Sequence, residues 1–67
     1  MVKVSVNGEE RELQAGMTVA QLLELLSAPE TGIAVAKNDR VVPRSAFGEE
    51  PIVYGDRIEI IRAVAGG

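Results

Sequence analysis

The fold is decided first by the N-terminal stretch MVKVSVNGEERELQ, residues 1–14. Over residues 2–6, valines alternate with polar residues, which is the period-two pattern of a strand with one buried face. Asn7-Gly8 follows, a dipeptide typical of a type I′ hairpin turn, because both central residues of that turn need a positive φ. Residues 9–14 are expected to return as a charged edge strand, with Leu13 as its inward anchor. The stretch therefore predicts a β-hairpin.

A helix is predicted to begin at Thr18. The residues Thr18-Val19-Ala20-Gln21 have the spacing of a capping box, in which the Thr hydroxyl and the Gln side chain satisfy free backbone N–H groups. Pro29 is expected to end the helix. Four apolar residues recur at helical spacing and should form one buried face. They are Val19, Leu22, Leu23 and Leu26.

Two short strands are predicted after the helix. Residues 33–37 form an apolar strand, and Asn38-Asp39 is expected to turn the chain into a second strand over residues 40–42. Pro43 cannot donate a hydrogen bond to a strand ladder, so the second strand ends there or lies at an edge of the sheet.

The last third of the chain is expected to be irregular before it forms a final strand. Phe47 and Ile52 should fill the core, and a turn at Gly55-Asp56 leads into a strand over residues 58–64. Asp56 is expected to cap this turn. Arg44 is expected either to pair with a carboxylate such as Asp56 or to touch a partner protein.

This order of elements predicts an α+β fold, with one helix packed across one face of a mixed sheet of about five strands. The apolar first and last strands are best placed side by side and parallel in the middle of the sheet. Such an arrangement is the β-grasp, or ubiquitin-like, fold. It predicts a β-grasp domain over residues 1–64 and a flexible C-terminal Gly-Gly tail over residues 65–67, which the central strand points away from the domain.

The composition excludes several classes of function. The chain has 67 residues, enough for one domain, and contains neither cysteine nor histidine, so a zinc site and a histidine-activated nucleophile are not expected. Its net charge of −3 disfavours nucleic acid. No apolar run approaches the about 20 residues that cross a membrane, and the N-terminus does not resemble a signal peptide. We therefore expect a cytoplasmic protein that binds no metal or cofactor and is not an enzyme by itself.

An ordered set of short motifs runs through nearly the whole chain and ends in a pair of glycines. The set consists of Asn7-Gly8-Glu9, Thr18-Val19 with Leu22-Leu23, Ile33-Ala34-Val35-Ala36 before Asn38, Val42-Pro43-Arg44-Ser45, Gly55-Asp56-Arg57-Ile58-Glu59-Ile60 and the terminal Gly66-Gly67. In this set the sequence resembles the ThiS family, the sulfur carriers of thiamine thiazole synthesis. Three residues depart from the family pattern: Lys37 stands where an apolar residue is more frequent, Asp39 where Gly is usual, and Tyr54 where an acidic residue is common.

The resemblance implies that the reacting group is the C-terminal carboxylate of Gly67. An E1-like, ThiF-type enzyme would adenylate it with ATP, and a sulfur donor such as a cysteine desulfurase would supply the sulfur that turns it into a thiocarboxylate. A ThiG-type thiazole synthase would then use that sulfur. Gly66 suits a tail that threads a narrow channel, because glycine has no Cβ and adopts conformations closed to other residues.

Contacts with the activating enzyme are expected at the end of the last strand. Alternation along this strand turns Ile58 and Ile60 toward the helix and Ile61 toward the opposite face, where Ala34 and Ala36 of the neighbouring strand can join it. An apolar patch on such a face often marks a partner surface. The residues expected to bind a partner are Ile61, Ala63, Val64 and Ala65.

Other functions remain open at the level of the sequence. A related carrier for molybdopterin synthesis or tRNA thiolation would share the fold and the tail. A ubiquitin-like modifier that becomes attached to target lysines would share them too. A plain interaction module would have the same domain with an incidental tail, and it would lose nothing on removal of Gly66 and Gly67.

Overall fold

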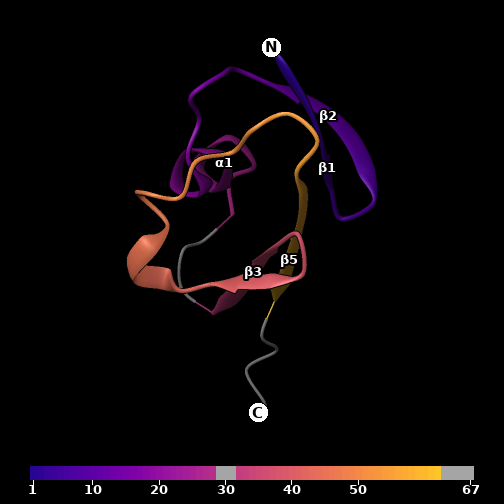
Figure 1. Cartoon of the computed structure of the whole chain (residues 1–67). Helices are drawn as coiled ribbons and strands as arrows, with labels where there is room; N and C mark the ends of the chain where they lie inside the picture. Colours follow the sequence, from indigo (N-terminus) through magenta and orange to yellow (C-terminus); the bar gives the residue numbers. More distant parts are fainter. Residues whose placement is uncertain (29–31, 63–67) are drawn as a thin grey trace.

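A five-stranded mixed sheet with one helix across one face makes up the part of the chain that the computed structural model describes, residues 1–28 and 32–62 (Figure 1). The strands lie in the order β2-β1-β5-β3-β4. This confirms the predicted α+β, β-grasp architecture. The elements are β1 Val2–Val6, β2 Glu9–Leu13, α1 Val19–Leu25, β3 Ile33–Lys37, β4 Arg40–Val42, the short 3-10 helix Arg44–Ala46 and β5 Arg57–Arg62.

The first and last strands lie side by side, as predicted. β1 pairs with β5 in parallel, with Ser5 opposite Arg57 and Val6 opposite Ile58. On its other side β5 pairs antiparallel with β3. Val4 and Val6 of β1 therefore share with Ile58 and Ile60 of β5 the face that packs against the helix.

The turns before and after β2 contain residues that readily adopt a positive φ. Asn7 and Gly8 have φ values of 51° and 82°, which confirms the predicted type I′ turn. β2 ends at Leu13, one residue earlier than expected. The reason is the turn that follows: the Met17 N–H donates to the Gln14 carbonyl, and Gly16 takes a φ of 86°.

The helix begins as predicted and ends earlier. The Gln21 N–H donates to Thr18 Oγ1 at 3.3 Å and the Thr18 N–H donates to Gln21 Oε1 at 2.9 Å, which completes the capping box. The predicted end at Pro29 is wrong, because α1 ends at Leu25. Ser27 adopts a φ of 56°, and the Ala28 N–H donates back to the Leu23 carbonyl, as in a Schellman motif. None of the described helices is long and apolar enough to span a membrane.

The core lies between the sheet and α1, and the irregular segment before β5 closes it. Phe47 and Ile52 are 4% and 1% exposed, which confirms that they fill the core. This segment is also bonded to the start of the helix, because the Val19 N–H donates to the Glu50 carbonyl. The remaining buried apolar residues are Val4, Val6, Leu13, Val19, Leu22, Leu23, Val35, Val42 and Ile58.

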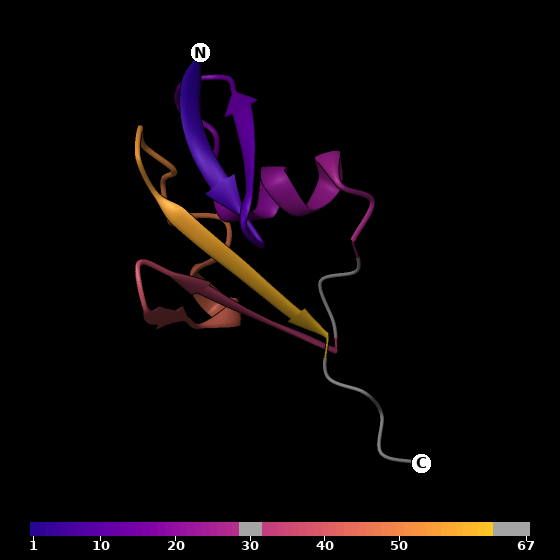
Figure 2. The ribbon, with the colours of Figure 1, turned by 90° about the vertical axis from the view of Figure 1, so that its right-hand side faces the viewer.

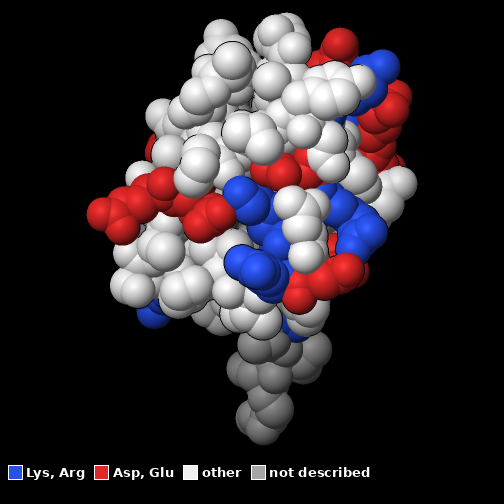
Figure 3. Space-filling model, viewed as in Figure 1, with Lys and Arg blue, Asp and Glu red and all other residues white. Residues whose placement is uncertain are grey.

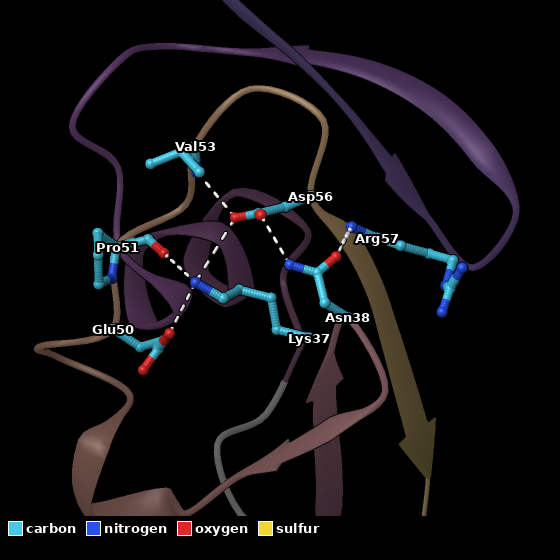
Figure 4. A network of polar contacts seen from close by, with 7 residues as sticks. All are labelled: Lys37, Asn38, Glu50, Pro51, Val53, Asp56 and Arg57. Carbon is cyan, nitrogen blue, oxygen red and sulfur yellow. Dashed lines mark hydrogen bonds and ion pairs between the residues drawn. The ribbon is translucent and has the colours of Figure 1, made fainter.

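A buried carboxylate holds the start of β5. Asp56 is 5% exposed, and it accepts hydrogen bonds from the Val53 N–H at 2.8 Å and from Asn38 Nδ2 at 2.9 Å. The side-chain oxygen of Asn38 accepts from the Arg57 N–H at 2.9 Å. Asp56 therefore caps its turn as predicted, and it also ties the β3–β4 turn to the first residue of β5 (Figure 4).

Lys37 supplies the cation for this carboxylate. Its ammonium lies 3.6 Å from Asp56 and 2.7 Å from Glu50, and it donates to the Pro51 carbonyl at 2.8 Å (Figure 4). The expected pairing of Arg44 with Asp56 is wrong. Lys37 lies opposite Ile58 in the sheet, so its side chain projects toward the core face, whereas Arg44 is an exposed residue of the 3-10 helix.

The same contacts change the titration of Lys37. The hydrogen bond to Glu50 raises the pKa of the lysine above its ordinary value of 10.5, burial opposes the rise, and the Asp56 carboxylate adds to it. Both carboxylates stabilise the charged form of the lysine. The network is therefore complete only while Lys37 carries its proton.

Replacing Asp56 by Asn should destabilise the fold. One carboxylate oxygen becomes an NH2 group, which must then face either Asn38 Nδ2 or the Val53 N–H, and both of these are donors. We expect Asp56→Asn to lower the free energy of unfolding by about 2 kcal/mol, measured by urea denaturation. Asp39→Asn is the matched control, because the Asp39–Arg57 ion pair is exposed. An equal shift of the urea midpoint in both variants would contradict the structural role of Asp56.

The stability of the protein should fall at alkaline pH through Lys37. Because its folded pKa is raised, its contribution is complete below the unfolded pKa and is lost as the pH rises through the folded value, above about pH 10. We expect Lys37→Met to reduce this loss in urea denaturation between pH 9 and 11.5. The Lys3→Met variant is the control, since Lys3 lies 3.9 Å from an exposed Glu10. Identical pH profiles for the original protein and Lys37→Met would contradict the role of Lys37.

Candidate functional site

The strand that leads to the predicted reacting end is well defined, whereas the end itself lies outside the described residues. Residues 63–67 include the predicted modification site Gly67, the tail residue Gly66 and three of the predicted partner contacts. Their roles stay predictions. β5 runs from Arg57 to Arg62 in the same direction as β1, so its end lies at the opposite end of the sheet from the N-terminus (Figure 1).

Side chains of β5 alternate between the two faces of the sheet. Ile58 is fully buried and Ile60 packs against the core, whereas Glu59 is exposed and Ile61 is 58% exposed. Ile61 therefore lies on the outer face, the face away from α1, as the alternation predicts. Its contact with a partner stays a prediction.

Ile61 belongs to a larger apolar surface on the outer face. Ala34 lies opposite Ile61, and Ala36 lies opposite both Glu59 of β5 and Val41 of β4. Val41 is 76% exposed and was missed in the sequence analysis. The sequence contained the information, because side chains alternate along a strand: with Val42 in the core, Val41 must lie on the opposite face. We call Ala34, Ala36, Val41 and Ile61 the outer apolar patch.

Charged residues border this patch. The exposed Arg57 pairs with Asp39 across the β3–β4 turn, and the Asp39 carboxylate raises the pKa of the guanidinium, with a smaller contribution from Glu59. Figure 3 shows basic side chains gathered in the middle of one face with acidic side chains beside them. Positive charge on that face is therefore interrupted and does not form the continuous basic stripe that tracks a nucleic acid backbone.

Two hollows of the described surface hold charged groups that already pair with each other. One is lined by Lys37, Arg40 and Glu50, and its lysine and glutamate form an ion pair. The other is lined by Lys3, Glu10 and Tyr54, and its lysine and glutamate lie 3.9 Å apart. Over residues 1–28 and 32–62, no three histidine, cysteine, aspartate or glutamate side chains are grouped so that they could hold a metal ion.

Sequence comparison relates the chain to proteins of thiamine biosynthesis. The model of the ThiS family matches residues 4–67. The sulfur carrier protein ThiS of Escherichia coli is 33% identical over 66 residues, which cover 98% of this chain and all of that protein. A thiazole synthase of Paramagnetospirillum magneticum is 38% identical over 66 residues, and one of Magnetococcus marinus is 33% identical. The chain spans about a fifth of the length of these two synthases, at 20% of each.

Solved structures agree with the sequence comparison. The crystal structure of a thiamine biosynthesis protein (ThiS) from Geobacter metallireducens superimposes with a TM-score of 0.85 at 26% identity, covering 98% of this chain and all of that one. A solution structure of a thiamine biosynthesis protein from the same organism gives a TM-score of 0.78 at 28% identity, with 98% and 88% of the two chains covered. With a family model that matches from residue 4 to residue 67, the chain belongs to the ThiS family.

Proposed function

We propose that this protein is a sulfur carrier of thiamine biosynthesis that carries its sulfur as a thiocarboxylate on Gly67. The observation that carries this proposal is the match to the Escherichia coli sulfur carrier over that protein's entire length. The order of the strands supports it, because β5 is the last element that the structure describes and the chain continues from it to Gly66-Gly67. The protein is then a cosubstrate, and the catalysis belongs to its partner enzymes.

The proposed chemistry begins with activation, because a free carboxylate has no good leaving group. In the active site of a ThiF-type enzyme, the Gly67 carboxylate attacks ATP, pyrophosphate leaves and an acyl-adenylate forms. A persulfide sulfur from a donor such as a cysteine desulfurase then attacks the acyl carbon, and AMP leaves. Attack by a second thiol on the resulting sulfur–sulfur bond releases Gly67 as the thiocarboxylate.

The proposed consumer of this sulfur is a ThiG-type thiazole synthase. Two thiazole synthases contain a segment similar to this chain within a longer polypeptide, of which the segment makes up 20%. A carrier and a synthase that share one chain in some organisms are natural partners as separate proteins in others. Thiocarboxylate sulfur is a soft nucleophile, which suits its transfer to a thiazole precursor in the cytoplasm.

The outer apolar patch is the proposed docking surface for the activating enzyme. It extends over β3, β4 and β5, and it presents Ile61 and Val41 to solvent with exposed fractions of 58% and 76%. Ala63, Val64 and Ala65 would extend the contact along the tail. Burial of such side chains in the centre of an interface is the usual source of binding energy.

The thiocarboxylate can be detected by mass spectrometry of the intact protein. After incubation with a ThiF-type enzyme, ATP and a sulfur donor, we expect the mass to rise by the difference between one sulfur and one oxygen atom. Fragmentation should localise the change to Gly67, and deletion of Gly66-Gly67 should abolish it. Addition of a ThiG-type synthase with its other substrates should return the mass to its original value.

Each other outcome of this experiment favours a different reading. Unchanged mass with several competent activating enzymes would contradict the carrier function. Conjugates of the protein with lysines of other proteins would favour a ubiquitin-like modifier. A thiocarboxylate that forms but is consumed only by a molybdopterin synthase or a tRNA-thiolating enzyme would contradict the thiazole pathway.

A charge at Ile61 should weaken binding to the activating enzyme and leave the fold intact. We expect Ile61→Glu to raise the Kd about tenfold or more in titration calorimetry, because an apolar anchor is replaced by a charge that must be desolvated. Leu25→Glu is the matched control: Leu25 is 56% exposed, close to the 58% of Ile61, but it lies on α1 on the other side of the sheet. An equal loss of affinity in both variants would contradict the outer apolar patch as the docking surface.

A further inference from the structure

The central strand β5 has neighbours on both sides for only part of its length. β3 accompanies it from Ile58 to Arg62, but β1 is paired with it only at Ser5 and Val6. β1 then turns away into β2 through Asn7-Gly8. Figure 2 shows β5 continuing past the end of β1. The final residues of β5 therefore lie at an edge of the sheet although the strand begins at its centre.

Hydrogen-bond alternation shows which backbone groups face this edge. The Asn38 N–H donates to the Arg57 carbonyl at 2.8 Å, so odd-numbered residues of β5 direct their backbone groups toward β3. The Asn7 N–H donates to the Ile58 carbonyl at 2.9 Å, so even-numbered residues face β1. Beyond the end of β1, the even-numbered residues are Ile60 and Arg62.

The side chain of Asn7 satisfies the first of these groups and leaves the next ones open. The Ile60 N–H donates to Asn7 Oδ1 at 2.8 Å, so a side-chain carbonyl takes the place of the next ladder partner. The Ile60 carbonyl and the Arg62 N–H come after this contact and face the same way. No strand of the described ranges lies on that side of them.

The other two edges of the sheet carry features that discourage pairing with another chain over their whole length. β2 consists of Glu-Glu-Arg-Glu-Leu, and β4 is only three residues long and is followed by Pro43. Charge, shortness and proline are the usual protections of an exposed edge. The edge formed by residues 60–62 is Ile-Ile-Arg. Although this edge is as short as β4 and ends in a charged residue, two of its three residues are apolar, no proline follows it in the sequence, and it continues a longer strand, so it can accept an added strand.

We infer that an extended segment of the activating enzyme adds to this edge as a further strand, and bonds to the Ile60 carbonyl and the Arg62 N–H. This inference rests on the proposed carrier function and adds the mode by which the partner enzyme binds the chain. Addition of a strand to an open edge is a recurrent mode of peptide recognition. The activating enzyme is the occupant we choose, because Ile61 of the outer apolar patch lies between the two bonding residues.

Strand addition at this place would also determine the direction of the tail. A segment bonded to residues 60–62 aligns the chain immediately before the tail begins, so less conformational entropy is left to lose when Gly67 reaches the nucleotide. Arg62 favours an acidic side chain directly opposite on the added strand. The added strand would bind backbone groups, so this contact does not need large side chains, which the terminal Ala65-Gly66-Gly67 does not offer.

The test uses the full chain, made by chemical synthesis with a single N-methyl group on the backbone nitrogen of Arg62. This change removes one donor at the open edge and touches no bond to β3. N-methylation at Glu12 is the matched control, because even-numbered residues of β2 face the outer edge at the far side of the sheet. We expect the Arg62 variant to bind a ThiF-type enzyme about tenfold more weakly, and the Glu12 variant to bind with unchanged Kd.

The remaining outcomes separate this inference from the carrier function. If the Arg62 variant binds as well as the unmodified chain while Ile61→Glu does not, strand addition is wrong and the carrier function stands. Weaker binding only to the thiazole synthase would mean that the occupant was misassigned. A backbone ester at Arg62, which removes the N–H without added bulk, replaces the N-methyl variant if circular dichroism shows that the latter is unfolded.

Discussion

The fold depends on the position of its last strand between its first strand and β3. β5 receives backbone hydrogen bonds from both sides over its first residues, so the C-terminal segment of a 67-residue chain becomes the centre of the sheet. The helix and the irregular segment before β5 then cover the one face where Val6, Val35 and Ile58 meet. Because these contacts join the two ends of the sequence, the sheet cannot be completed until the whole domain is present.

The polar contacts of β5 are concentrated at its beginning. At the beginning, Asp56 and Asn38 accept hydrogen bonds from the backbone N–H groups of Val53 and Arg57. Lys37 supplies a cation that contacts three oxygens of other residues. At the end, only β3 accompanies the strand. A small domain without disulfides thus concentrates its polar bonding where rigidity is needed and leaves the stretch that approaches the tail accessible. The first residues of β5 are therefore held on both sides, whereas the last residues are open to a partner on one side.

Local features of the sequence predicted most of the fold, and long-range contacts explain what was missed. The Asn7-Gly8 turn and the capping box at Thr18 depend on neighbouring residues, so they could be predicted correctly. The helix end could not, because Ser27 adopts a conformation usual for glycine. Lys37 stood out only as a departure from the family, since its partners come from the irregular segment, which no periodicity describes. The open edge of β5 could not be predicted either, because it becomes visible only when the pairing of β5 with both β1 and β3 is known residue by residue.

The parallel arrangement of β1 and β5 has a mechanical consequence. Lys3, Ser5 and Asn7 bond to the chain from Gly55 to Ile58, and these bonds lie across the strand direction. A pull that draws the tail away while the N-terminus is held loads them together in shear and does not open them one after another. Bonds loaded together in shear resist a pull better than bonds opened one at a time, so we expect the domain to unfold at a higher force in this direction than when a hairpin is peeled apart. The same geometry makes the N-terminus the suitable point for attaching the protein to a surface or a probe.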